Sequence, residues 1–133
     1  LYIHNFEPGR WPAGSPDPEV CNRLIPFGEY DSSPTKTYMI EHQYDHGVAA
    51  LAHLAFGKRP AEELYRLKDD PHQMNNVAGS KGFEAIQADL RERLFAHLEK
   101  TKDPRVVGGL IEWDYYPHYG RHANKNWKVD ERP

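Results

Sequence analysis

The stretch from Ser80 to Lys102 reads SKGFEAIQADLRERLFAHLEKTK, and it sets the fold of the second half of the chain. Asp89 and Arg93 lie four residues apart, a spacing that supports a helix through an ion pair. Lysines near the end of the stretch suit the negative end of a helix dipole, and Pro104 limits extension beyond it. The apolar residues recur every three or four positions and predict one face of a long helix: Phe83, Ile86, Leu90, Leu94 and Leu98.

Two short segments before this helix have the character of β-strands. Leu1–Phe6 mixes aliphatic and aromatic residues and is stopped by Glu-Pro-Gly. Ala61–Lys68 places apolar side chains on one face of an extended chain and ends at Asp-Asp-Pro. Asp69 and Asp70 could ligate calcium, but turn chemistry before Pro71 explains them without an ion.

Two helices are predicted between the strands, after a long loop over residues 6–33 that is rich in proline and glycine. Ser33 is a good N-cap before a proline, which predicts a helix over Pro34–Tyr44. Apolar residues spaced at helical intervals over Val48–Ala55 predict a second, shorter helix. Gly57 follows it where a left-handed residue often ends a helix.

Composition bounds the class of protein. The chain has 133 residues, and 17 Lys and Arg against 20 Asp and Glu leave a net charge of -3, which gives no electrostatic reason to expect nucleic acid or an anionic membrane surface. The longest apolar run, Val48–Ala52, is far shorter than the roughly 20 residues that span a bilayer. Cys21 is the only cysteine, so no internal disulfide forms. The chain opens inside a strand-like segment, and we expect it to be a piece of a longer protein.

Two small clusters are candidate anion or sugar sites. Arg10 and Trp11 stand together on the long loop, and they suit a sulfated or carboxylated sugar because Arg binds anionic groups bidentately beside an aromatic platform. The alternative is a Trp that only anchors the loop. Ser33, Thr35 and Lys36 gather at a helix N-terminus, where backbone N–H groups and a cation favour anions, although capping alone would explain them.

Two histidine pairs, His42/His46 and His118/His122, have the i,i+4 spacing of metal ligands on a helix. Gln43 stands where a zinc protease needs a Glu, so we interpret these histidines as solvated or substrate-facing. Cys21 could be a nucleophile, but it has no base nearby in the sequence and is interpreted as an ordinary thiol.

The segment Lys58–Ala78 reads KRPAEELYRLKDDPHQMNNVA. It closely resembles the C-terminal signature of the type I sulfatase family, in which a run P-x-E-L-Y-D-L-x-x-D-P-x-E-x-x-N-L forms a strand and turn leading into the final long helix. Arg66 replaces the usual Asp and Gln73 the usual Glu. Four flanking stretches are similar to the bacterial branch related to heparan N-sulfatase, that is N-sulfoglucosamine sulfohydrolase: Tyr2–Gly14, Asp31–Tyr38, Asp103–Val106 and Tyr115–Gly120.

The resemblance implies an α+β fold. Residues 1–133 would be the C-terminal subdomain of an alkaline-phosphatase-like sulfatase, a small antiparallel sheet packed by a long C-terminal helix, with long irregular loops. The intact enzyme would be a sulfuric ester hydrolase or sulfamidase that uses calcium and formylglycine. The formylglycine motif Cys/Ser-x-Pro-x-Arg is missing, because Cys21 is followed by Asn-Arg-Leu-Ile. We therefore expect no catalytic or metal-ligating residue here, and no activity without the N-terminal catalytic α/β domain.

Under this interpretation the chain helps to select the substrate. The residues expected to approach the sugar are Arg10, Trp11, Lys36, His4 and Asn5. The expected partners are the missing catalytic domain and a sulfated sugar of the glycosaminoglycan type, with self-association through the face that would meet that domain. The family's bacterial members are usually exported, which implies a periplasmic or extracellular location. The alternative is a stand-alone carbohydrate- or metal-binding module without catalytic activity.

Overall fold

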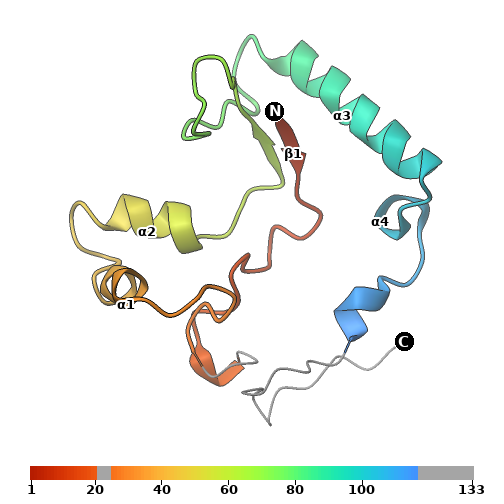
Figure 1. Ribbon diagram of the computed structural model, residues 1–133. Coiled ribbons are helices and arrows are strands. Elements are labelled where there is room, and N and C mark those ends of the chain that lie inside the picture. Colours follow the sequence, from red (N-terminus) through yellow and green to blue (C-terminus); the bar gives the residue numbers. More distant parts are fainter. Residues whose placement is uncertain (21–24, 117–133) are drawn as a thin grey trace. The chain divides into compact units, whose positions relative to one another are not determined.

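The computed structural model describes residues 1–20 and 25–116, and the chain forms two compact units (Figure 1). Unit 1 consists of Leu1–Glu7 and Pro60–Ile111. Unit 2 consists of Pro8–Arg59 and the described residues 112–116. Both candidate strands and the long helix lie in unit 1, whereas the proline-rich loop lies in unit 2.

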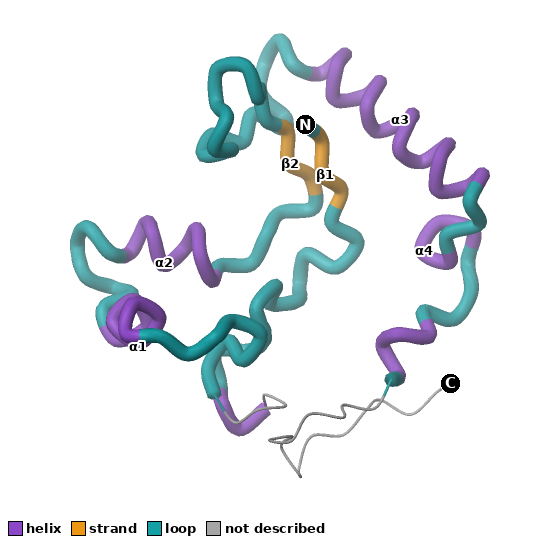
Figure 2. The backbone as a smooth tube through the Cα atoms, in the orientation of Figure 1, coloured by secondary structure: helices purple, strands orange, loops and turns teal. Residues whose placement is uncertain are grey.

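A two-stranded antiparallel sheet forms the centre of unit 1 (Figure 2). Strand β1 (Tyr2–His4) pairs with strand β2 (Glu62–Leu64), with Tyr2 opposite Leu64. Both predicted strands are confirmed, but β2 is shorter than Ala61–Lys68. It ends early because the chain turns at Arg66, whose carbonyl accepts the N–H groups of the next two aspartates.

The predicted long helix is confirmed as α3 (Glu84–Lys100), which packs on β1, although none of its residues is buried and Ile86 of the predicted apolar stripe is exposed. The ring of Phe95 meets that of His4 edge-on at 5.0 Å between centroids. The expected i,i+4 ion pair forms, with Arg93 Nη1 3.6 Å from Asp89 Oδ2. Gly82, at φ 90°, makes the turn before the helix. A short helix, α4 (Pro104–Val107), follows and is capped by the side chain of Asp103.

Unit 2 contains the helices α1 (Pro34–Glu41) and α2 (Ala49–Phe56) and two single 3-10 turns, Pro18–Val20 and Glu112–Tyr115. Ser33 caps α1 as predicted, accepting the N–H of Lys36 at 3.1 Å. The prediction that α1 reaches Tyr44 is wrong. The helix ends at Glu41 because the chain turns at His42, whose carbonyl accepts the N–H of Asp45 at 2.9 Å.

The predicted left-handed end of α2 at Gly57 is also wrong, because this residue has φ -62° and an extended backbone. Glycine is required at this position because a side chain would have no room. A Cβ at Gly57 would lie 2.5 Å from the carbonyl oxygen of His53 and 2.7 Å from its Nδ1. The chain therefore leaves α2 in an extended direction that any larger residue would obstruct.

The core of unit 2 is small and brings its loop against α2. Its buried members are Ala13, Phe27, Ala52 and Phe56, and Met39, Ile40 and Ala55 pack against them. Helices and a small antiparallel sheet together confirm the α+β class. None of the described helices is long and apolar enough to cross a membrane.

Candidate functional site

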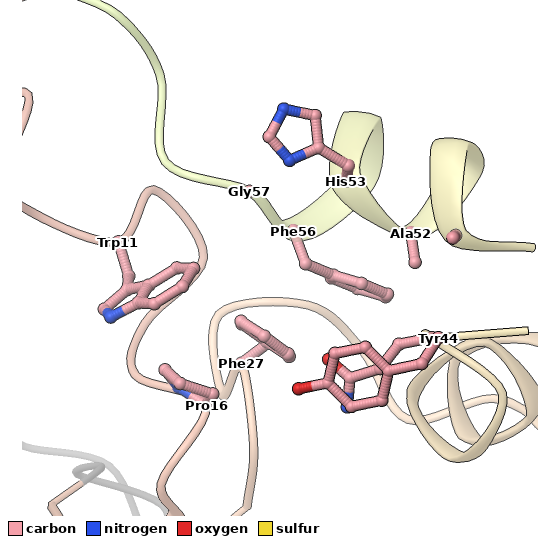
Figure 3. Close-up of a pocket in the computed structure, with 10 residues that line it drawn as sticks. Trp11, Pro16, Phe27, Tyr44, Ala52, His53, Phe56 and Gly57 are labelled. Carbon is pink, nitrogen blue, oxygen red and sulfur yellow. The ribbon is translucent and has the colours of Figure 1, made fainter.

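An aromatic pocket of about 380 Å³ lies in unit 2, between the proline-rich loop and α2 (Figure 3). In this view Trp11 and Tyr44 stand on either side of the Phe27 and Phe56 rings. Volumes of this order are typical of small-ligand sites, which combine apolar walls with a few polar groups. The pocket is lined by Trp11, Pro16, Phe27, Gln43, Tyr44, Ala49, Ala52, His53, Phe56 and Gly57.

Three aromatic rings form a continuous wall of this pocket. Phe27 stacks on Phe56 with 4.7 Å between ring centroids and 16° between ring planes. Trp11 meets Phe27 edge-on at 5.9 Å and stays 38% exposed. Its indole therefore both anchors the loop, as the alternative interpretation expected, and presents a surface to solvent.

A cation lies against the same indole. The Nζ atom of Lys58 is 5.1 Å from the centroid of the Trp11 ring, within the range of a cation–π interaction. Lys58 follows Gly57 at the end of α2, so the helix end and the loop tip together produce the pair. An exposed indole with an ammonium group beside it can bind an apolar ring that carries a negative charge.

Lys36 lies beneath this wall rather than on the surface. It is buried, and its ammonium group donates to the carbonyl oxygens of Phe27 at 2.8 Å and Tyr30 at 2.9 Å. Phe27 has φ 48°, a left-handed conformation that is unfavourable for a bulky residue. The two hydrogen bonds hold the turn that places the Phe27 ring against Phe56.

Arg10 is engaged with a carboxylate. Its two terminal nitrogens donate to Asp114 Oδ1 and Oδ2, each at 3.0 Å, in a bidentate pair. This hydrogen bonding lowers the pKa of Asp114 below its ordinary value. The Arg10 side chain remains 59% exposed, so an incoming anion would compete with Asp114 for it.

The other two predicted site residues, His4 and Asn5, lie in unit 1. His4 sits between Phe6, at 4.6 Å, and Phe95, at 5.0 Å, and its buried Nδ1 has no hydrogen-bond partner among the described residues. The Asn5 side chain accepts the N–H of Glu7 at 3.0 Å. Of the five predicted residues, only Trp11 lines the pocket.

The remaining candidates from the sequence do not assemble into a metal site. His42 pairs with Asp45, Nδ1 to Oδ2 at 2.6 Å, and it lies beyond the end of α1, so it shares no helix face with His46. In residues 1–20 and 25–116, no three His, Cys, Asp or Glu side chains are grouped so that they could hold a metal ion. Cys21, His118 and His122 lie outside the described residues.

The signature segment folds into a tight turn beside β2. Asp70 accepts the N–H groups of Met74 and Asn75, each at 2.9 Å, and these bonds lower its pKa. Asn76 accepts the N–H of Leu64 at 2.9 Å and donates to the Glu62 carbonyl at 3.3 Å. The turn interpretation of the Asp-Asp-Pro sequence accounts for Asp70 without calcium.

Sequence reasoning missed the other nine residues that line the pocket, and also Lys58, which lies over the Trp11 ring. Phe56 and Lys58 flank the glycine that ends α2, and their position beside this glycine was the feature of the sequence that could have identified them. Phe27 offered no such signal, because its position depends on the left-handed turn and on the buried Lys36.

No family model, no curated protein and no solved structure matches the chain.

Proposed function

We propose that this chain is the C-terminal part of a sulfatase-type hydrolase that acts on sulfate esters or sulfamates of sugars, and that unit 2 supplies a sugar-binding wall. The observation that carries the proposal is the Lys58 ammonium group over the exposed Trp11 indole at the aromatic pocket. A sulfated sugar presents an apolar ring face and an anion, and this pair offers a partner for each.

The folding of the signature segment also supports the proposal. The resemblance implies a strand and turn before a long helix, and the chain has β2, the turn at Asp70 and then α3 in that order. The Asp and Asn that the signature shares with this chain at positions 70 and 76 both bind backbone groups of that turn or strand. The strand and turn that the resemblance implies therefore account for these two residues.

The role proposed for this chain is recognition. In the family that the chain resembles, formylglycine supplies the nucleophile and calcium stabilises the sulfate oxygens. This chain would hold the sugar ring on Trp11 and its anionic group near Lys58 and Arg10, excluding water from the aromatic wall. The catalytic domain would then be its partner, and the family's usual export implies a periplasmic or extracellular enzyme.

A stand-alone saccharide-binding module is the second candidate. It is favoured by the fact that all ten residues that line the pocket belong to unit 2, so the pocket needs no other domain for its walls. Both candidates bind the same kind of ligand. They differ in whether the protein that contains this chain releases sulfate.

Binding by the chain itself tests the shared step. We expect a heparin-derived disaccharide containing N-sulfoglucosamine to shift the Trp11 indole resonance in NMR titrations, and its desulfated form to bind at least tenfold more weakly. Trp11→Ala and Lys58→Met should each weaken binding about tenfold, about 1.4 kcal/mol, whereas Lys81→Met, in unit 1, makes the same charge change without effect. Equal binding by Lys58→Met and Lys81→Met would refute the proposed wall.

Hydrolysis separates the two candidates. The protein encoded by the complete gene should release sulfate from N-sulfoglucosamine or from 4-methylumbelliferyl sulfate, and Trp11→Ala should lower kcat/KM for the sugar about tenfold. The small aryl substrate should be less affected because it lacks the sugar ring. The sulfatase proposal is excluded if the complete gene product binds the disaccharide but carries no Cys/Ser-x-Pro-x-Arg motif and releases no sulfate. The stand-alone binding module would then be the function.

A further inference from the structure

An ion pair between Arg10 and Asp114 joins two distant segments of unit 2. The two terminal nitrogens of Arg10 donate to Asp114 Oδ1 and Oδ2, each at 3.0 Å, across 104 positions of the sequence. Arg10 belongs to the proline-rich loop, and Asp114 lies in the 3-10 turn Glu112–Tyr115. Two parallel hydrogen bonds are also the geometry in which a guanidinium group binds other oxyanions, such as phosphate. The Asp114 carboxylate therefore occupies donors that an anionic ligand would use.

The carboxylate is the more sheltered partner of this pair. The Asp114 side chain is 26% exposed, whereas that of Arg10 is 59% exposed. The hydrogen bonds from Arg10 lower the pKa of Asp114 below its ordinary value, so the carboxylate is charged at neutral pH. An anion from solvent can thus approach the guanidinium group, but it competes there with a carboxylate that the fold holds in place.

Arg10 directly precedes the exposed indole of the aromatic pocket. Consecutive Cα atoms are about 3.8 Å apart, so a sugar ring on Trp11 places its substituents within reach of the Arg10 side chain. Lys58 lies over the same indole, with Nζ 5.1 Å from the ring centroid, and makes no ion pair in the part of the chain that the structure describes. The two cations beside Trp11 therefore differ, because Arg10 is paired with a carboxylate of the chain itself.

We propose that Asp114 is an intramolecular competitor that blocks free anions from Arg10 and is displaced by a sulfated sugar whose ring also binds Trp11. The contacts of the ring with the indole and of the anion with Lys58 supply the free energy that separates Arg10 from Asp114. Inorganic sulfate has no ring to place on Trp11, so it competes with the carboxylate without this contribution. The site thereby prefers a sulfated sugar to the free sulfate that hydrolysis would release.

The sugar in this inference rests on the proposed function, whereas the competition at Arg10 is a property of the ion pair. An exposed ion pair contributes little, and the affinity of a ligand falls by the fraction of sites that the competitor leaves available. We therefore expect Asp114 to lower the affinity for an anionic ligand about three- to fivefold.

Removing the carboxylate tests the competition. Asp114→Asn should bind the N-sulfoglucosamine disaccharide about three- to fivefold more tightly than the unmodified chain, measured from the Trp11 indole resonance. Inorganic sulfate, with the ionic strength held constant by sodium chloride, should shift the Arg10 Nε resonance in Asp114→Asn and much less in the unmodified chain. Glu112→Gln is the matched control, because it removes the same charge from an exposed residue of the same turn and should change neither titration.

A double-mutant cycle with Arg10→Gln separates direct competition from a general effect of charge. Without the guanidinium group, Asp114→Asn should no longer change the affinity for the disaccharide. The desulfated disaccharide should bind equally to the unmodified chain and to Asp114→Asn, because it brings no sulfate group to Arg10.

Two results would overturn the inference. One is binding of both probes by Asp114→Asn no tighter than by the unmodified chain, because the carboxylate would then not compete with an anion. The other is an equal gain in affinity from Glu112→Gln, which would mean that only the net charge of the turn matters. A disaccharide that binds none of these proteins contradicts the proposed function instead, and the sulfate titration at Arg10 still decides whether Asp114 competes.

Discussion

The ammonium group of Lys36 makes two hydrogen bonds to backbone carbonyls inside unit 2, at Phe27 and Tyr30. The sequence placed Lys36 correctly in the first turn of a helix, as part of a candidate anion site for which helix capping alone was the alternative. The side chain instead reaches back to the loop, because the left-handed turn at Phe27 directs a carbonyl toward it. Local sequence could not predict this contact, since it depends on how a loop nine residues earlier returns to the helix.

Replacing Lys36 by Met tests this contact. The substitution keeps most of the apolar stem but leaves two carbonyls without their donor, so we expect a loss of about 1–3 kcal/mol in the free energy of unfolding, measured with urea. Stacking of Phe27 on Phe56 should loosen, and the affinity of the aromatic pocket for the N-sulfoglucosamine disaccharide should fall with it. Lys68→Met, at an exposed lysine, is the matched control, and equal stability of the two variants would contradict the role.

At the scale of elements, the turn after β2 shows what sequence can predict. Asp-Asp-Pro indicated a turn, and the capping oxygens of Asp70 agree with it. Helix α3, which spans Glu84–Lys100, was predicted within Ser80–Lys102 because its apolar residues repeat over four turns. The end of α1 was missed because His42, Gln43 and Tyr44 continue a plausible helix until the bond between Asp45 and His42 turns the chain.

Asn76 is the residue that covers the edge of β2, and no local pattern predicted this role. Asn76→Ala should remove the acceptor of the Leu64 N–H and cost about 1–2 kcal/mol. Hydrogen exchange of the Leu64 amide should become faster, with a smaller change at Val77, whose own bond is backbone to backbone. In Asn75→Ala the side chain that is removed makes no hydrogen bond in the described part of the chain. If Asn75→Ala accelerated exchange of the Leu64 amide as much as Asn76→Ala does, the Asn76 side chain would not be what covers the edge of β2.

For the whole molecule, acid should destabilise both units through lowered carboxyl pKa values. Hydrogen bonding to Arg105 lowers the pKa of Asp103 in unit 1 to about 2, and Arg10 lowers that of Asp114 in unit 2. A carboxyl group whose pKa is lowered in the folded state stabilises the fold at pH values above its ordinary pKa of 3.8. This stability is lost as the pH falls through the pKa of the folded state. The urea midpoint should therefore drop between about pH 4 and pH 2. Arg105→Gln should flatten the unit 1 part of that drop, and an unchanged profile would contradict the assignment.

The loss of stability at high pH should arise in the sheet of unit 1, where the Tyr2 hydroxyl contacts Glu62. Burial, with the hydrogen bond that Tyr2 donates to Glu62, raises the pKa of the Tyr2 phenol to about 12 from an ordinary value of 10.0. A raised pKa contributes stability that is complete below pH 10 and is lost as the pH rises toward 12. Tyr2→Phe should lose the Glu62 contact at every pH and show a shallower decline of the urea midpoint from pH 10 to 12. Tyr44→Phe, at an 89% exposed tyrosine, should decline as the unmodified chain does. Equal slopes for Tyr2→Phe and Tyr44→Phe would mean that the contact between β1 and β2 at Glu62 does not govern the loss of stability at high pH.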